Sequence, residues 1–162
     1  MKRLISIFSV LILFCSVPFY TSANTKVHSE RIISQEKEYY SDGTSAVITI
    51  TEHNDLPATR ASSNTRIATK TYRLLNKDGK TLWEFAVKGT FSYTPGVSSV
   101  CTASSYSINI IENAWENKSA TTTKSGNQCI GDATFIRKLL FITVETKSCH
   151  VVLTCDSYGN VS

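Results

Sequence analysis

The chain has 162 residues, of which 41% are hydrophobic and 19% are charged, and its formal net charge is +4. This composition is that of a globular protein and excludes intrinsic disorder, and the length suits one domain better than two. Removing Lys2 and Arg3, which belong to a leader, from the 17 basic residues leaves 15 against 13 acidic ones. So mild and dispersed a charge excludes a nucleic-acid partner, because such proteins carry clustered basic residues.

Residues 1–23 have the pattern of a secretory signal peptide. Two basic residues form a positive amino end, an apolar run follows from Leu4 to Phe14, and small residues lead up to Ala23. Pro18 ends the apolar run well short of the roughly 20 residues that a transmembrane helix needs. We therefore predict a secreted, extracellular protein that is cleaved after Ala23 and has no membrane span once the signal is removed.

Residues 24–66 are predicted to form a polar arm, a first hairpin and a linker. The arm runs from Asn24 to Gln35, and the hairpin from Glu36 to Glu52 turns at Ser41–Thr44 around an Asp-Gly pair. The segment from His53 to Arg66 contains several Ser and Asn residues and has no hydrophobic periodicity, which is typical of a linker.

Residues 67–162 are predicted to form the main β domain, organised around a hairpin from Lys70 to Tyr93. Its turn is Asp78-Gly79, which is among the strongest signals for a two-residue type I′ turn because both central residues need positive φ. Closing the hairpin there gives three cross-strand pairs: Leu74 with Trp83, Tyr72 with Phe85, and Arg73 with Glu84. The first two pairs are apolar and the third is polar, so turn register and side-chain alternation agree.

Five aromatic residues share one face of this hairpin: Tyr72, Trp83, Phe85, Phe91 and Tyr93. Such a face suits a sugar-stacking platform or the buried side of a sheet. The strict alternation with polar neighbours favours the buried side, because it is typical of an antiparallel sheet with one wet face.

The carboxyl-terminal half contains three further strand patterns, at Ser98–Ile111, Cys129–Arg137 and Ile142–Cys155. Lys118–Asn127 is low in apolar residues and is predicted to be a loop with at most a short strand. The apolar phase of the last strand slips near Lys147, which favours a β-bulge there. No window has helical periodicity. We predict an all-β fold, an antiparallel β-sandwich or small barrel of about six to nine strands stapled by disulfides.

Four cysteines follow the leader: Cys101, Cys129, Cys149 and Cys155. An even number in an exported chain indicates disulfides. Cys149 and Cys155 lie on one predicted strand, roughly 20 Å apart, which is too far for a bond. We expect Cys129–Cys149 with Cys101–Cys155, and the alternative is Cys101–Cys149 with Cys129–Cys155. The cysteine spacing does not fit zinc, and neither a metal nor another cofactor is predicted.

Catalytic motifs are absent from the sequence, and no catalytic residue is predicted. A Ser–His–Asp triad leaves no sequence pattern when it assembles in space, so His53 and His150 keep that alternative open. Glu112 and Glu116 beside Trp115 suggest a glycosidase pair, but solvated charges around a half-buried Trp are the favoured interpretation.

The segment from Ile136 to Phe141 places three large apolar residues beside two cations. If the last hairpin turns near Leu139, these residues lie at or near its tip. The contact residues are then Arg137, Lys138, Leu139, Leu140 and Phe141. Either they form an exposed tip that contacts a partner or a lipid surface, or the apolar ones fold back and cap the core.

Four motifs occur in order along the chain: T-K-T-Y-R at Thr69–Arg73, N-K-D-G-K-T-L-W-E-F at Asn76–Phe85, K-G-T-F-S-Y-T at Lys88–Thr94, and V-x-L-T-C followed by a Gly at Val151–Gly159. With these motifs the chain resembles uncharacterised small secreted β-rich proteins of Gram-positive, clostridia-like bacteria, from about Tyr39 onward. The resemblance implies an extracellular compartment and a common Cys101–Cys155 pair, with Cys129 and Cys149 as additions in this member. It implies no established activity and no catalytic residues.

We expect a secreted, non-catalytic extracellular domain that binds a cell-surface, glycan or protein partner. One alternative is a secreted hydrolase with a triad that the sequence does not reveal. The other is a secreted inhibitor or immunity-type protein, for which Leu139–Phe141 would be the inserting loop.

Overall fold

A computed structural model describes residues 29–54 and 64–162, and every regular element in them is a β-strand. The strands are β1 (Ser29–Tyr39), β2 (Ser45–Asn54), β3 (Thr65–Leu75), β4 (Thr81–Thr94), β5 (Ser98–Ile110), β6 (Trp115–Ser125), β7 (Gln128–Leu139) and β8 (Ile142–Thr154). The prediction of an all-β fold is confirmed. The predicted leader and most of the predicted linker lie outside the described residues.

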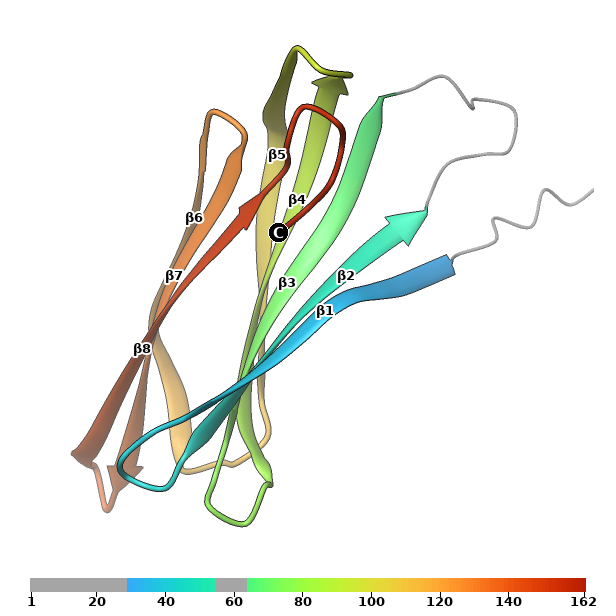
Figure 1. Cartoon of the computed structure of the whole chain (residues 1–162). Helices are drawn as coiled ribbons and strands as arrows, with labels where there is room; N and C mark the ends of the chain where they lie inside the picture. Colours follow the sequence, from blue (N-terminus) through green and yellow to red (C-terminus); the bar gives the residue numbers. More distant parts are fainter. Residues whose placement is uncertain (1–28, 55–63) are drawn as a thin grey trace, which may run out of the picture.

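The strands form two antiparallel sheets, one of five strands in the order β1-β2-β3-β4-β5 and one of three in the order β6-β7-β8 (Figure 1). The β3–β4 hairpin has the predicted register in all three of its named pairs: Leu74 with Trp83, Tyr72 with Phe85, and Arg73 with Glu84. Arg73 and Glu84 also form an ion pair, so the polar face of the hairpin is cross-linked as the pairing predicts. The first hairpin, β1–β2, joins the same sheet because β2 pairs with β3 along its length.

The two sheets face each other across a single core that is centred on Trp83. Its ring stacks on Phe135 of the other sheet with centroids 3.8 Å apart and on Tyr72 of its own sheet at 5.6 Å. Trp115 meets it edge-on at 6.3 Å. Of the predicted aromatic face, Trp83, Phe85 and Phe91 are fully buried, so these residues are core and not a sugar-stacking platform.

Two glycines allow the sheets to approach closely. A Cβ at Gly131 in β7 would overlap the Cγ2 atom of Val87 in β4 and would lie 3.1 Å from the Phe85 ring. A Cβ at Gly89 would lie 2.7 Å from the Phe91 ring and 3.1 Å from Cys129 Cβ. The absence of a side chain at both positions lets the large aromatic rings fill the gap between the sheets.

Two predicted element boundaries and one predicted bulge position are wrong. Part of the predicted arm is strand, because β1 begins at Ser29. The predicted loop at Lys118–Asn127 is mostly β6, whose run of threonines has high β propensity although it buries little apolar area. The bulge in the last hairpin lies at Val144 rather than near Lys147, since Arg137 pairs with Glu145 and Lys138 with Thr143.

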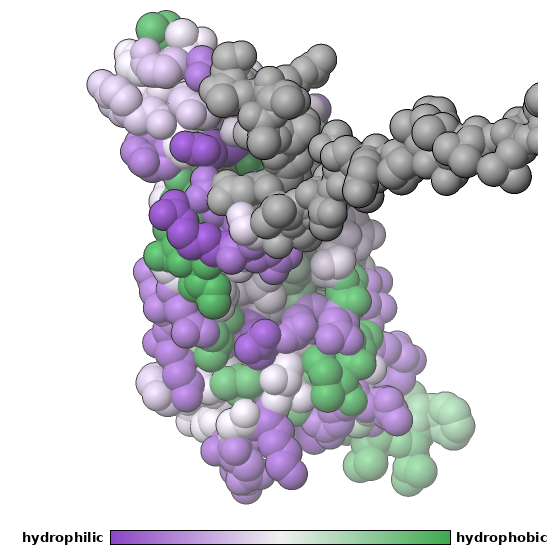
Figure 2. Space-filling model, turned by 90° about the vertical axis from the view of Figure 1, so that its right-hand side faces the viewer, coloured by the Kyte–Doolittle hydropathy of each residue, from purple (hydrophilic) through white to green (hydrophobic). Residues whose placement is uncertain are grey.

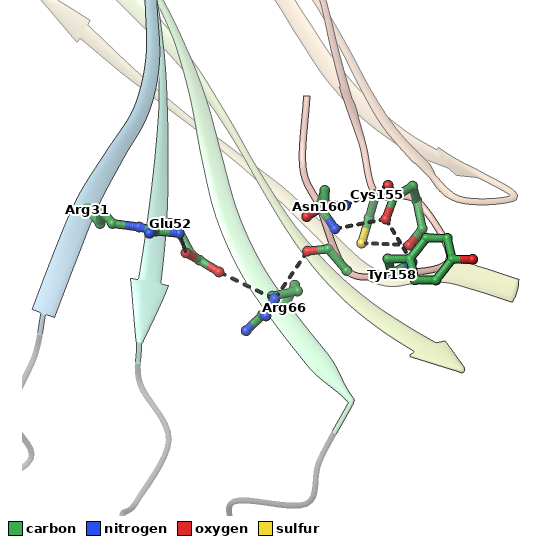
Figure 3. A network of polar contacts seen from close by, with 8 residues as sticks. Arg31, Glu52, Arg66, Cys155, Tyr158 and Asn160 are labelled. Carbon is green, nitrogen blue, oxygen red and sulfur yellow. Dashed lines mark hydrogen bonds and ion pairs between the residues drawn. The ribbon is translucent and has the colours of Figure 1, made fainter. Parts of the chain in front are cut away.

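The polar tail is held against the five-stranded sheet by a network around Arg66 (Figure 3). Arg66 Nε donates to the Gly159 carbonyl at 3.1 Å and lies 3.4 Å from Glu52 Oε1. Glu52 is only 6% exposed, and its other oxygen accepts from Arg31 at 2.8 Å. A buried carboxylate is costly without partners, so both arginines stabilise it and bring strand and tail together. Val161 is buried beneath this contact.

The predicted disulfide stapling is not seen, because the four cysteines of the described residues are buried and none is bonded to another. The strand register of the last hairpin excludes the expected Cys129–Cys149 bond. Cys129 faces Leu153 and Cys149 faces Ala133, so the two cysteines are four positions out of step. That offset corresponds to roughly 13 Å along the strand. The expected Cys101–Cys155 pair and both pairs of the alternative connectivity are likewise unbonded.

The close approach at Gly131 predicts that Gly131→Ala destabilises the protein by about 1–3 kcal/mol, because the added methyl group overpacks the gap. Chemical denaturation of the variant measures this directly. Val87→Ala removes the atom that the new methyl group meets, so the double variant should lose less stability than the two single losses added together. Strict additivity would show that the sheets can separate at this point without cost.

Candidate functional site: an apolar hairpin turn

The β7–β8 hairpin ends in a two-residue turn of unusual composition. Leu139 pairs with Ile142, and between them Leu140 and Phe141 have φ values of 47° and 72°. Positive φ at both central residues is the signature of a type I′ turn, which ordinarily carries Asn-Gly or Asp-Gly. In a bulky residue each such φ costs on the order of 1–3 kcal/mol. The backbone is therefore strained at Leu140 and Phe141, two positions at which a glycine would adopt the same φ without strain.

Every side chain of this turn is in solvent. Leu139 is 64% exposed, Leu140 83%, Phe141 97% and Ile142 68%. We call Leu139–Ile142 the apolar turn. Of the two sequence interpretations, the core cap is wrong and the exposure of the tip is confirmed, while its contact with a partner stays a prediction.

The apolar turn is exposed because the β7–β8 hairpin extends beyond the start of the neighbouring strand β6. The last β6–β7 pair joins Trp115 to Arg137, and the Lys138 amide then donates to the Ala114 carbonyl at 2.9 Å. Beyond Lys138 none of the described strands pairs with the hairpin, which extends past the core (Figure 1). In Figure 2 an apolar group projects from the lower, far end of the molecule, at the end where the β7–β8 turn lies.

The two cations beside the apolar turn are neutralised within the hairpin region. Arg137 Nε lies 3.0 Å from Glu145 Oε2, and Lys138 Nζ lies 2.6 Å from Glu116 Oε1. Sequence reasoning placed Arg137 and Lys138 at a contact surface, and the structure keeps them behind the turn with their charges matched. Glu116 therefore has a charge partner in Lys138.

Sequence reasoning missed Ile142 and Val144 as members of this surface. Val144 is 48% exposed beside the turn. The available signal was the run of four consecutive apolar residues, which no alternating strand with one wet face should contain.

A polar groove of about 510 Å³ lies at the same end of the molecule. Its lining residues are Asp42, Thr44, Asn76, Lys77, Leu82, Glu112, Trp115, Arg137 and Glu145. Charges of both signs are present and partly paired, and the Trp115 ring is buried. The buried Nε1 of Trp115 has no hydrogen-bond partner among the described residues, but it is also closed to solvent, so no ligand in the groove reaches it.

His53 and His150, the two histidines in the described residues, do not assemble a complete hydrolytic site. His53 Nε2 lies 2.8 Å from Thr69 Oγ1, and His53 Nδ1 lies 3.2 Å from Glu30 Oε1, which gives the order of groups found in a triad. Thr69, however, lies in β3, which is paired on both sides. The backbone N–H groups around Thr69 form hydrogen bonds within the sheet, so they supply no donors for an oxyanion. His150 pairs with Asp132 at 2.7 Å on an exposed face.

The cysteines are poor nucleophiles. Burial raises the pKa of the Cys149 thiol to about 12, and burial together with the Cys129 thiol raises the pKa of Cys101 to about 11. A thiol that stays protonated at neutral pH does not attack a substrate. A metal-binding group of three or more His, Cys, Asp or Glu residues is absent from residues 29–54 and 64–162.

Comparison of the chain with known protein families, with characterised proteins and with solved structures finds no match. The part of the chain that the structure describes contains no helix long and apolar enough to cross a membrane.

The strained apolar turn predicts that the double substitution L140N/F141G raises the free energy of unfolding by about 1–2 kcal/mol. Asn-Gly adopts the type I′ turn without strain, and the removed side chains make no core contact. Urea denaturation gives the change. The control L140A/F141A keeps a side chain at each left-handed position and should gain less. A loss of stability in L140N/F141G would show that the turn packs on the core.

Proposed function

We propose that the protein is a secreted, non-catalytic domain that binds a cell surface by inserting the apolar turn into its lipid. The observation that carries this proposal is the exposure of four consecutive large apolar side chains on a turn that projects from the body. Soluble proteins rarely present such a contiguous group unless it contacts a membrane or another protein. The strain stored at Leu140 and Phe141 supports the same conclusion, because strained backbone clusters at functional sites.

The shape of the turn favours lipid over a one-sided protein groove. The side chains of Leu139 and Ile142 flank the turn while Leu140 and Phe141 extend from its end, so apolar surface faces several directions at once. A bilayer solvates all of these directions, whereas a shallow groove covers only one. Two residues on each arm reach roughly 7 Å, which matches the depth of about 5–10 Å to which interfacial elements enter a bilayer.

The charges around the turn define which lipids it should bind. Arg137 and Lys138 are each paired with a carboxylate, so they present little net positive charge to a headgroup. Burial of apolar area is then the driving term, and it does not depend on lipid charge. We therefore expect little preference for anionic lipid and little sensitivity to salt.

Vesicle co-sedimentation of the chain from Asn24, the predicted mature form, tests the proposal. The wild-type chain should sediment with pure phosphatidylcholine vesicles and to a similar extent with vesicles containing phosphatidylglycerol, in low and in high salt. Removing two side chains that each contribute about 1.5–3 kcal/mol on burial should lower the partition coefficient of L140N/F141G at least about 100-fold.

Val97→Asn is the matched control. Val97 is 75% exposed, but it lies in the β4–β5 turn at the opposite end of the molecule. This variant loses a comparable exposed apolar side chain and should bind vesicles as the wild type does. A wild-type chain that stays in the supernatant with both kinds of vesicle would overturn the proposal, as would equal losses in Val97→Asn and L140N/F141G.

The second candidate function is a secreted inhibitor that inserts the apolar turn into a cleft of a partner protein. The specific observation in its favour is the fixed left-handed backbone at Leu140 and Phe141, since a preformed loop loses little entropy on binding. A panel of secreted proteases provides the assay. Inhibition by the wild type that disappears in a folded Leu140→Asp variant would favour this function over lipid binding.

A further inference from the structure

The four cysteines do not form two equivalent pairs. The connectivity expected from sequence assumes that every thiol is bonded, and it discards Cys101–Cys129 only because the partner bond, Cys149–Cys155, is too long. If two thiols stay free, that objection disappears. A single Cys101–Cys129 bond then requires only that these two cysteines lie close together.

Cys101 and Cys129 belong to opposite sheets but meet against the same strand, β4. Cys101 pairs with Phe91 of β4, while Cys129 packs on Gly89, where its Cβ would be 3.1 Å from an added methyl group. The Cys129 sulfur also lies 3.7 Å from the Lys88 carbonyl. Gly89 thus creates the space through which the β7 cysteine reaches the five-stranded sheet.

Backbone and side-chain contacts hold the two strands in this position. The Cys101 amide donates to the Gly126 carbonyl in the β6–β7 turn at 2.8 Å. Lys124, which pairs with Cys129, extends its ammonium group to the Thr102 carbonyl at 2.8 Å. Burial, and after it the neighbouring Cys129 thiol, raise the pKa of the Cys101 thiol.

The other two cysteines are less well placed. Cys149 faces Ala133, four positions from the residue opposite Cys129, and is too distant along the strand. Cys155 continues β8 two residues beyond Leu153, the residue opposite Cys129, so it is a diagonal neighbour at roughly 7–8 Å. The Cys155 thiol donates instead to the Asp156 carbonyl at 3.5 Å.

We propose that Cys101 and Cys129 form a single disulfide that links the two sheets, while Cys149 and Cys155 remain thiols. The oxidant is a small-molecule disulfide such as glutathione disulfide. One cysteine thiolate attacks it and releases one glutathione thiolate, and the resulting mixed disulfide is then attacked by the second cysteine thiolate, which releases the second glutathione. Two electrons pass from the cysteine pair to glutathione, and the two cysteine protons end on the two glutathione thiols. This inference is independent of lipid binding.

The bond should form during folding rather than afterwards. Cys101 is 5% exposed and Cys129 is fully buried, so glutathione does not reach either sulfur once the sheets have closed. Oxidation of the unfolded chain followed by exchange gives both sulfurs access to the reagent. The folded, reduced protein should accordingly exchange slowly.

Refolding the full chain with Cys15→Ser, which removes the leader thiol, in a glutathione redox buffer tests the pairing. Alkylation under denaturing conditions should then find two free thiols, and peptide mapping should find Cys101 joined to Cys129. The oxidised protein should melt about 5–15 °C above the reduced protein, because the bond closes a loop of roughly 28 residues. Cys149→Ser should leave the bond in place, whereas Cys101→Ser should leave no major disulfide.

Peptide mapping of the Cys15→Ser chain decides the question even if a cysteine variant fails to fold. A major Cys101–Cys155 or Cys129–Cys149 peptide would overturn the proposal. Two disulfides, or four free thiols after refolding at an oxidising glutathione ratio, would do so equally.

Discussion

The structure depends on the contact between two rings, Trp83 of one sheet and Phe135 of the other, whose centroids are 3.8 Å apart. Elsewhere along β4 and β7 two glycines let the same sheets approach, since an added Cβ would overlap Val87 at Gly131 and the Phe91 ring at Gly89. Apolar burial and close packing thus hold the sheets together.

The same constraint accounts for the exposed end of the molecule. The core closes at Trp115, which meets Trp83 edge-on, and β6 begins at that residue. The β7–β8 hairpin continues for several residues without a neighbour, so its last apolar side chains have no core to enter. The strained backbone at Leu140 and Phe141 and the exposed apolar surface both lower the stability of the folded chain. Violations of local rules of this kind are expected where a protein contacts something else.

The number of cysteines does not by itself predict which of them form a bond. Their even number and their place in a predicted exported chain favour complete pairing, and that assumption alone produced the expected connectivities. The register of β7 with β8 separates Cys129 from Cys149, and the packing of β7 on β4 places Cys129 against the same strand as Cys101. Neither fact is contained in the spacing of the residues, because both arise from contacts between strands distant in sequence.

The sequence by itself determined the all-β class, the β3–β4 register and the burial of Trp83, Phe85 and Phe91. These properties follow from local turn chemistry and from the alternation of side chains along one strand. It also identified Leu139–Phe141 as either cap or tip. Only the tertiary structure decided between the two, because the outcome depends on where β6 and the core end relative to the last hairpin. The strand at Lys118–Asn127 was likewise decided by pairing with β7, which overrides a weak apolar signal.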